Sequence, residues 1–232
     1  MASQTLQLTT DQLNAIKSYT TCMVANAIEV FNVRLRNEGY TRPGLRCVTG
    51  NLPPMFGYAA TSRVKTENPP PVGHSYYDRT DWWDAIEALP EPRVAVIQDI
   101  DSTPGLGSSV GEVHASILKA LNCAGVVTNG SVRDIPAVAA MQFPMFARSV
   151  SVSHSYIHMV DFGEPVSICG LAIRSGDLLY GDCHGLLSIP IEIAAEIPRV
   201  ADKIARDRKK IIDLCQSPDF SLDKLRKQVQ QL

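Results

Sequence analysis

The chain has 232 residues, of which 45% are hydrophobic and 20% charged, and its formal charge is −2. This length suits one α/β domain, and the composition is that of an ordinary globular protein rather than a disordered, collagen-like or coiled-coil one. Because basic and acidic residues nearly balance, no overall positive field would hold a polyanion, and we expect no nucleic-acid ligand.

Three further observations concern the environment of the protein. The longest uncharged stretches, such as residues 136–146, are well short of the roughly 20 apolar residues that cross a bilayer, so we expect no membrane contact. The first seven residues contain neither a cationic start nor an apolar run, so we expect no targeting peptide. The six cysteines include no Cys-x-x-Cys pair, which disfavours a zinc site and a disulfide framework. Together these features predict a cytoplasmic protein.

The N-terminal part is predicted to be helical. Capping side chains at 9–11 precede apolar residues at helical spacing as far as Phe31, which indicates one or two helices. A loop rich in glycine, proline and asparagine then leads to a predicted strand over 55–64. The aromatic segment Tyr76–Trp83 precedes a helix that ends near Leu89. Ordinary packing is the favoured interpretation of these aromatic residues, and a wall of a site or an interface is the alternative.

The central part alternates between strands and helices. Val94–Asp99 is an apolar run typical of a strand that is buried on both faces. The elements predicted to follow are helices over 112–123 and 135–141 and strands over 125–128, 145–149, 164–168, 171–173, 177–180 and 186–189. Helical periodicity returns over 191–214, where Pro198 should kink or restart the helix, and again over 222–229. This order predicts an α/β protein without a linker, so residues 1–232 are expected to form a single domain.

One segment places charged residues where α/β proteins bind ligands. The glycine-rich loop Gly105–Glu112 runs into a helix, and Arg133 and Asp134 follow the next strand, with twenty residues between Glu112 and Arg133. Because the helix returns the chain to the start of a parallel strand, these groups should meet at the carboxyl edge of the sheet. Glu112, Arg133 and Asp134 are therefore expected to converge on one crevice.

The residue types in this crevice suit a small anion and a hard cation. A glycine-rich loop followed by free helix N–H groups can cradle an anion, and Arg133 can bind a carboxylate through two parallel hydrogen bonds. Asp134 offers hard oxygen ligands for Mg²⁺ or Mn²⁺. Plainer interpretations stay open: Asp134 can cap the helix that begins at Ile135-Pro136, and Glu112 can favour its helix N-terminus through the dipole. The glycines can also serve only to shape a turn, because neither a complete dinucleotide pattern nor a Walker motif is present.

Three histidines are weaker candidates. His154 and His158 have the spacing of two metal ligands on a helix, but residues 150–160 are predicted to be loop and strand, where such residues lie far apart. His158 alone lining the crevice is the better expectation. His184 is expected to be a turn residue, and Cys183 has no paired base in sequence that would make it a nucleophile.

At these residues the sequence resembles a known family. Gly111-Glu112, twenty intervening residues and Arg133-Asp134 resemble the signature of the 4-hydroxy-4-methyl-2-oxoglutarate aldolase family, which also contains the regulator of ribonuclease activity A. The block 124–134 is similar to the central block of that family, and 175–190 is similar to its Pro-Gly-Asp strand and Asp-x-x-Gly turn, with Ser175 in place of the proline. The resemblance covers a core of residues 57–190. It implies a single α/β/β sandwich of the phosphohistidine-swivelling-domain type, with N- and C-terminal helical extensions.

The resemblance also implies a class II aldolase that cleaves a 4-hydroxy-2-oxo acid of the 4-hydroxy-4-methyl-2-oxoglutarate type to pyruvate and also decarboxylates oxaloacetate. Arg133 would bind the carboxylate or the C2 oxygen, and Asp134 would bind Mg²⁺ or Mn²⁺. Glu112, where the family often has aspartate, would polarise a water for proton transfer at the pyruvate methyl carbon. The other substrate-binding positions, which would act through the backbone, are Gly111, Val113 and His114.

Two further implications concern partners. Members of the family form trimers or hexamers with sites at subunit interfaces, so the resemblance implies a homo-oligomer. The alternative function is a non-catalytic, protein-binding regulator of the ribonuclease-inhibitor type. Three converging charged residues favour catalysis, because a binding module does not need them.

Overall fold

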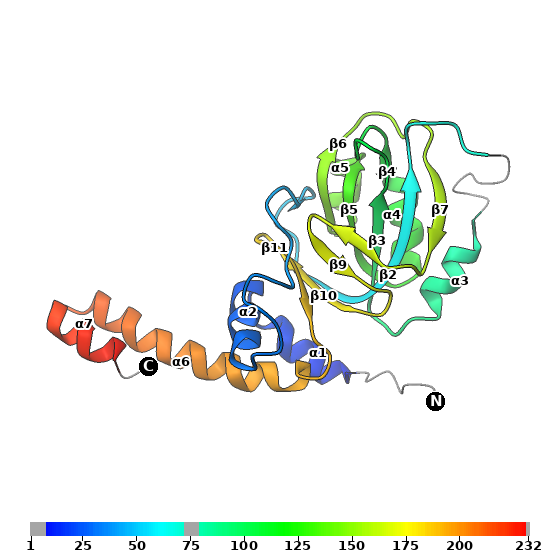
Figure 1. Ribbon diagram of the computed structural model, residues 1–232. Helices are drawn as coiled ribbons and strands as arrows, with labels where there is room; N and C mark the ends of the chain where they lie inside the picture. The colour runs from blue at the N-terminus through cyan, green and yellow to red at the C-terminus, as the bar shows by residue number, and fades with distance from the viewer. Residues whose placement is uncertain (1–7, 72–78, 231–232) are drawn as a thin grey trace.

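The computed structural model describes residues 8–71 and 79–230, and a large mixed sheet forms its centre (Figure 1). The strands of this sheet are β1 (Arg46–Cys47), β2 (Met55–Lys65), β3 (Arg93–Asp99), β4 (Ser108–Val110), β5 (Cys123–Val132), β6 (Met145–Val150), β7 (His158–Phe162), β10 (Leu178–Asp182) and β11 (Gly185–Ile189). Their order is β1-β6-β5-β3-β2-β10-β11, with β4 beside β5 and β7 beside β2. Neighbouring strands among β2, β3, β5 and β6 run parallel, as the alternation of strands and helices predicted.

The two faces of the sheet are covered by different layers. Alternate residues of β3 point to opposite faces, so Ala95 and Ile97 belong to one core while Val94 and Val96 belong to another. The first face is covered by the helices α3 (Asp81–Glu87), α4 (Glu112–Ala120) and α5 (Ile135–Ala140). The second face is covered by a two-stranded sheet of β8 (Val166–Ile168) and β9 (Leu171–Ile173), which lies in front of β3 in Figure 1. The predicted α/β/β sandwich is therefore confirmed.

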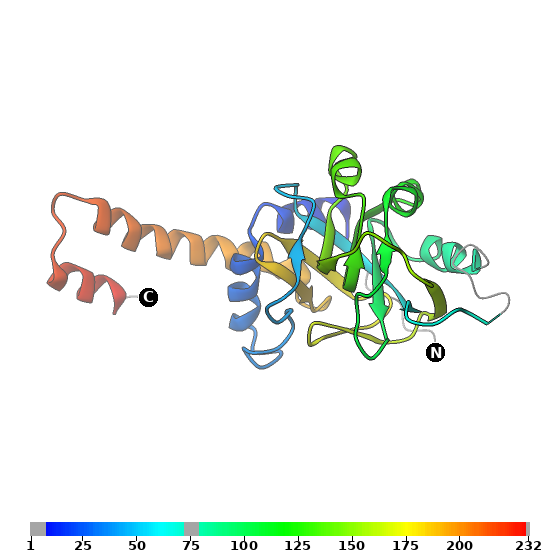
Figure 2. The ribbon, with the colours of Figure 1, turned by 90° about the horizontal axis from the view of Figure 1, so that it is seen from above.

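A third core joins the helical extensions to the end of the sheet formed by β10 and β11. The helices here are α1 (Thr10–Lys17), α2 (Thr21–Val30) and α6 (Ile197–Gln216). Pro198 lies in the first turn of α6, directly after a short 3-10 turn over Ala194–Glu196, so it begins the helix rather than kinking it. The distal half of α6 and the last helix, α7 (Leu222–Val229), extend away from the sheet (Figure 2).

Two expectations about local structure are decided by burial. Residues 108–110 form the strand β4 rather than a loop, because they pair with β5 and are buried. Trp82 is buried in the core under α3, and Trp83 is packed against the same core, which agrees with packing rather than a site wall. Tyr76 and Tyr77 lie outside the described residues.

No helix within the described ranges combines the length and the apolar character that crossing a bilayer requires.

Candidate functional site

A cavity of about 420 Å³ opens where β4 and β5 end and α4 begins. All six residues predicted for the site line it: Gly111, Glu112, Val113, His114, Arg133 and Asp134. They converge because β4 and β5 are parallel, so the residue after β4 and the two residues after β5 meet at the same edge of the sheet. The backbone N–H of Arg133 donates to the Val110 carbonyl at 2.9 Å and holds the two segments together.

Asp134 is placed by an unusual backbone conformation. Its φ of 56° and ψ of 33° lie in the left-handed region, which a residue with a side chain adopts at some cost. It precedes α5, but its side chain makes no capping bond to that helix. Instead, its Oδ2 accepts the backbone N–H of Glu112 at 3.0 Å, at the start of α4. Asp134 therefore occupies the N-cap position of α5, as the plainer interpretation expected, but without a side-chain cap, because the left-handed turn directs the carboxylate to the neighbouring helix and the cavity.

Arg133 lies beside this carboxylate. Its Nε is 3.6 Å from Asp134 Oδ2, and the two side chains are 37% and 43% exposed. Within residues 8–71 and 79–230, the terminal NH groups of Arg133 make no hydrogen bond, so they can still bind a ligand carboxylate in the bidentate manner.

Gly111 keeps space for these two side chains. A Cβ at this position would lie 2.4 Å from Asp134 Oδ2 and 3.1 Å from Arg133 Nε. Its φ of −129° is open to any residue, so the need for glycine comes from crowding rather than from backbone conformation. The structure thus gives Gly111 a steric function that the sequence pattern did not reveal.

His114 contributes a side chain as well as the backbone group expected from the sequence. Its Nδ1 donates to the Ser109 carbonyl at 3.1 Å. Burial lowers the pKa of His114 to about 4, so the imidazole is neutral at pH 7. A sequence signal for this role was absent, because the strand β4 that supplies the carbonyl was expected to be a loop.

The expected anion cradle in the glycine-rich loop is corrected by the hydrogen bonds of that segment. The hydroxyls of Ser108 and Ser109 donate to the carbonyls of Val110 and Ser131 at 3.0 and 3.1 Å. The N–H of Gly105 donates to Asp99 Oδ2 at 2.8 Å, and this carboxylate would repel an anion. The N-terminus of α4, which borders the cavity, is the remaining part of the predicted cradle.

The segment 154–157 also lines the cavity. Its lining histidine is His154, whereas His158 was the histidine expected there. His154, Tyr156 and Ile157 line it, whereas His158 is buried in β7, where its Nδ1 donates to the Tyr156 carbonyl at 2.8 Å. The prediction that His158 lines the crevice is therefore wrong. His158 pairs with Lys65 in the ladder of β2 and β7 and is not among the residues that line the cavity.

The charge of the site bears on metal binding. With His114 neutral, the ionised residues Glu112, Arg133 and Asp134 sum to one negative charge. An anionic ligand in this cavity needs additional positive charge. Asp134 offers carboxylate oxygen, a hard ligand, and Mg²⁺ usually keeps several waters and takes only one or two protein carboxylates. The residues present therefore fit a largely hydrated divalent cation.

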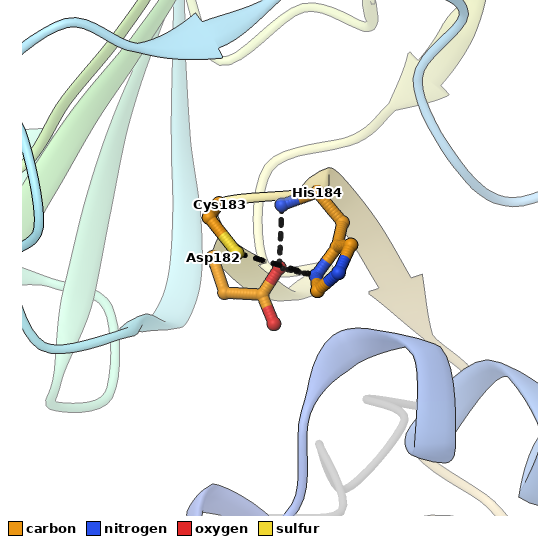
Figure 3. A group of neighbouring side chains, drawn as sticks. All are labelled: Asp182, Cys183 and His184. Atoms are coloured by element: carbon orange, nitrogen blue, oxygen red, sulfur yellow. Dashed lines mark hydrogen bonds and ion pairs between the residues drawn. The ribbon is translucent and has the colours of Figure 1, made fainter.

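A second group of possible metal ligands lies in the turn between β10 and β11 (Figure 3). One ligand atom from each of Asp182, Cys183 and His184 lies within 4.8 Å of the others. However, the Asp182 carboxylate accepts the N–H and hydroxyl of Thr21 at 2.9 and 2.7 Å, and the N–H and Nδ1 of His184 at 2.9 and 3.0 Å. These bonds anchor the start of α2 on the sheet, so the group is explained by packing. His184 is a turn residue, as predicted.

The chain is similar in sequence and in fold to several known proteins. An uncharacterised protein of Methanocaldococcus jannaschii is 33% identical over 88 residues, which are 38% of this chain and 42% of that protein. A putative 4-hydroxy-4-methyl-2-oxoglutarate aldolase of Halalkalibacterium halodurans is 28% identical over 152 residues, covering 62% of this chain and 71% of the relative. The solved structure of Streptomyces coelicolor RraAS2, described as an unusual member of the RNase ES inhibitor RraA family, has a TM-score of 0.67 at 17% identity and covers 89% of this chain and 97% of its own.

The fold agrees with these likenesses. The structural neighbour supports the fold alone, since its sequence identity is low. The match to the family itself spans residues 21–187, which is more than two thirds of the chain and includes every residue of the predicted site. The chain therefore belongs to the RraA-like (Aldolase/RraA) family.

Proposed function

We propose that the protein is a divalent-metal-dependent lyase that cleaves a 4-hydroxy-2-oxo acid to pyruvate. The observation that carries this proposal is the meeting of Glu112, Arg133 and Asp134 in one cavity beside a helix N-terminus. One guanidinium and one hard cation together suit a substrate that carries a carboxylate next to a carbonyl. The relative named as a putative 4-hydroxy-4-methyl-2-oxoglutarate aldolase supports the same reaction class.

Arg133 and Asp134 divide the binding of the pyruvyl part. The free terminal NH groups of Arg133 bind the carboxylate or the C2 oxygen, and the N–H groups at the start of α4 add to the positive potential there. Asp134 would hold Mg²⁺ or Mn²⁺, and this cation would supply Lewis-acid charge for the developing enolate. The hydrogen bond from the Glu112 N–H fixes the Asp134 carboxylate, so its position is set before substrate arrives.

Glu112 serves proton transfer. In the cleavage, the C4 hydroxyl passes its proton through a bound water to the Glu112 carboxylate, the C3–C4 bond breaks, and its electron pair passes to C3 as the pyruvate enolate. C3 then takes a proton from a water that is polarised by Glu112, which gives pyruvate and a carbonyl fragment. Loss of CO₂ from oxaloacetate leaves the same enolate, so we expect oxaloacetate decarboxylation at this site as well.

The second candidate function is a protein-binding regulator without catalysis. It is favoured by the likeness of the fold to RraAS2, whose description places it among RNase ES inhibitors. The two functions differ in what the cavity must do. A regulator requires neither the cation nor the exposed NH groups of Arg133.

Pyruvate release distinguishes the two functions. Purified protein with Mg²⁺ or Mn²⁺ is given 4-hydroxy-4-methyl-2-oxoglutarate or oxaloacetate, with and without a chelator, and pyruvate is measured by a coupled lactate dehydrogenase assay. We expect release that the chelator abolishes and added Mg²⁺ restores. Arg133→Ala should remove it, whereas Arg148→Ala, an exposed arginine on β6 outside the cavity lining, should not. Release of no pyruvate from either substrate, nor from a monocarboxylic 4-hydroxy-2-oxo acid, would favour the regulator.

A further inference from the structure

The proposed substrate class can be narrowed by the part of the cavity that the pyruvyl group does not use. Besides the charged residues, Val113, Tyr156, Ile157 and Pro70 line the cavity. Val113 is 60% exposed and Tyr156 52% exposed, although both are large apolar residues. Apolar side chains that stay open to solvent in a cavity with a few convergent polar groups are typical of a ligand site with an apolar component.

The positive charges of the cavity are few. Arg133 is the only lysine or arginine among the described residues that line it. Residues 1–7, 72–78 and 231–232, which lie outside the described ranges, contain no lysine or arginine in the sequence. His114 is neutral because burial lowers its pKa to about 4. The described lining therefore contains one lysine or arginine side chain, Arg133, beside the histidines His114 and His154.

A 2-oxo acid with a second carboxylate would find no cationic side chain left to bind that second carboxylate. Arg133 and the cation at Asp134 are both required by the pyruvyl carboxylate and carbonyl. The second carboxylate of 4-hydroxy-4-methyl-2-oxoglutarate would then lie near Val113, Tyr156 and Ile157, which offer it no cationic partner, and any hydration that it loses there is costly. A neutral apolar group in the same place would instead gain by burial against these side chains.

We propose that the preferred substrates are monocarboxylic 4-hydroxy-2-oxo acids whose C4 carries an apolar or aromatic group. This inference rests on the proposed lyase function. The C3–C4 bond breaks as described above, so the products are pyruvate and an uncharged aldehyde or ketone. The cavity volume of about 420 Å³ is in the range of pockets that take small organic ligands, so an aromatic group can be accommodated beside the pyruvyl part.

The test compares two substrates in the presence of Mg²⁺: 4-hydroxy-2-oxo-4-phenylbutanoate and 4-hydroxy-4-methyl-2-oxoglutarate. We expect the KM for the phenyl substrate to be at least about tenfold lower than the KM for the dicarboxylate, which lacks a partner for its second charge. An equal or lower KM for the dicarboxylate would overturn the inference.

The two substrates also differ in intrinsic reactivity. This difference cancels when the ratio of their kcat/KM values in a charge-adding variant is compared with the same ratio in the wild type. Val113→Arg keeps the backbone N–H of Val113 and adds a cation to the apolar wall. It should shift the ratio of kcat/KM toward the dicarboxylate by about tenfold or more. Val30→Arg adds the same charge at an exposed valine on α2, away from the cavity, and should leave the ratio unchanged. Tyr156→Arg is the second variant at the wall and should shift the ratio in the same direction.

Failure of the inference and failure of the lyase proposal give different results. Exchange of the pyruvate methyl protons in D₂O, followed by NMR, needs only Arg133, Asp134, the cation and Glu112. Metal-dependent exchange, together with an unchanged ratio of kcat/KM in both Val113→Arg and Tyr156→Arg, would overturn the apolar-substrate inference. The lyase proposal would then remain supported. Absence of exchange would overturn the lyase proposal, and the inference with it.

Discussion

Arg133 combines a fixed backbone with a side chain whose terminal NH groups remain available. Its N–H is bound to Val110 and its Nε lies beside Asp134, so the guanidinium is oriented before a ligand binds. Preorganised donors of this kind typically contribute about 10²–10³ to a rate. We expect Arg133→Ala to lower kcat/KM for pyruvate release by at least about 10², measured at saturating Mg²⁺.

Arg133→Lys tests whether geometry or charge matters. A lysine keeps the charge but cannot offer two parallel hydrogen bonds, so we expect it to recover only a small part of the activity. Full recovery in Arg133→Lys would show that Arg133 acts as a simple point charge, contrary to bidentate binding.

Gly111 gives a second test at the residue level. A methyl group would lie 2.4 Å from Asp134 Oδ2, so Gly111→Ala must displace this carboxylate or the chain of α4. We expect a loss of activity of about 10² or more, since a displacement of about 1 Å at an active site has this effect. The melting temperature should change little in comparison, because Gly111 is at the rim of the cavity. An active Gly111→Ala protein would show that the position of Asp134 is not critical.

The hydrogen bonds of Asp182 imply that the free energy of unfolding depends on pH in the acid range. Burial would raise the pKa of this carboxyl, but the hydrogen bonds from Thr21 and His184 outweigh it, and the pKa lies below its ordinary value of 3.8. A lowered folded-state pKa stabilises the protein above pH 3.8, and this contribution is lost as the pH falls through the folded-state value.

We therefore expect Asp182→Asn to lower the free energy of unfolding by about 1–3 kcal/mol at pH 7. The difference from wild type should shrink below pH 3.8. Urea unfolding at pH 7 and at several values below pH 4 measures both effects, and a difference that stays constant with pH would contradict the assignment.

At the level of elements, α4 connects the core to the site. Leu118 is fully buried between this helix and the sheet, while Glu112 and Val113 at its start line the cavity. Leu118→Ala should cost about 2–5 kcal/mol of unfolding free energy, as for other large-to-small changes in a core. Val30→Ala, at an exposed position on α2, should change it by less than about 0.5 kcal/mol. Denaturant titration of both variants measures the difference, and equal effects would show that α4 is not packed as described.

The elements differ in how far the sequence alone predicted them. Val94–Asp99 was predicted because both of its faces are buried, which gives a continuous apolar run. The strand β4 was missed because glycines and serines have weak strand propensity, and its pairing with β5 is a long-range contact. The left-handed backbone at Asp134 was missed for a related reason, since an aspartate before Ile135-Pro136 resembles an ordinary helix cap.

At the level of the whole molecule, the convergence of the site residues was predictable, but their contacts were not. Parallel strands joined by helices bring Glu112 and Arg133 to one edge of the sheet through the backbone topology alone, independently of side-chain contacts. The contribution of Tyr156 and Ile157 depends on a connection between β6 and β7 that carries no periodic signal. The near-neutral net charge similarly implied that attraction for an anion must be local, and the structure places one arginine and a helix N-terminus in the cavity.

The C-terminal arm, formed by α6 from its midpoint and by α7, carries the last prediction. α7 has no buried residue, and Ile212, Phe220, Leu222 and Val229 are each about half exposed on an arm that extends away from the sheet (Figures 1 and 2). Two amphipathic helices that leave apolar side chains in water gain free energy by covering them, and most soluble oligomers are assembled from copies of one chain. We expect the protein to form a homo-oligomer, a trimer or a hexamer, through this arm.

Light scattering after size exclusion tests this assembly. Ile212→Asp combined with Leu222→Asp should lower the mass toward that of one 25.3 kDa chain, because two carboxylates would have to be buried in the interface. Val33→Asp, at an exposed valine after α2, should leave the mass unchanged. If the assembly also completes the cavity, the double variant should lose pyruvate release together with mass. A wild-type mass of a single chain would contradict the expected oligomer, since the apolar residues of the arm would then be stable in water without a partner.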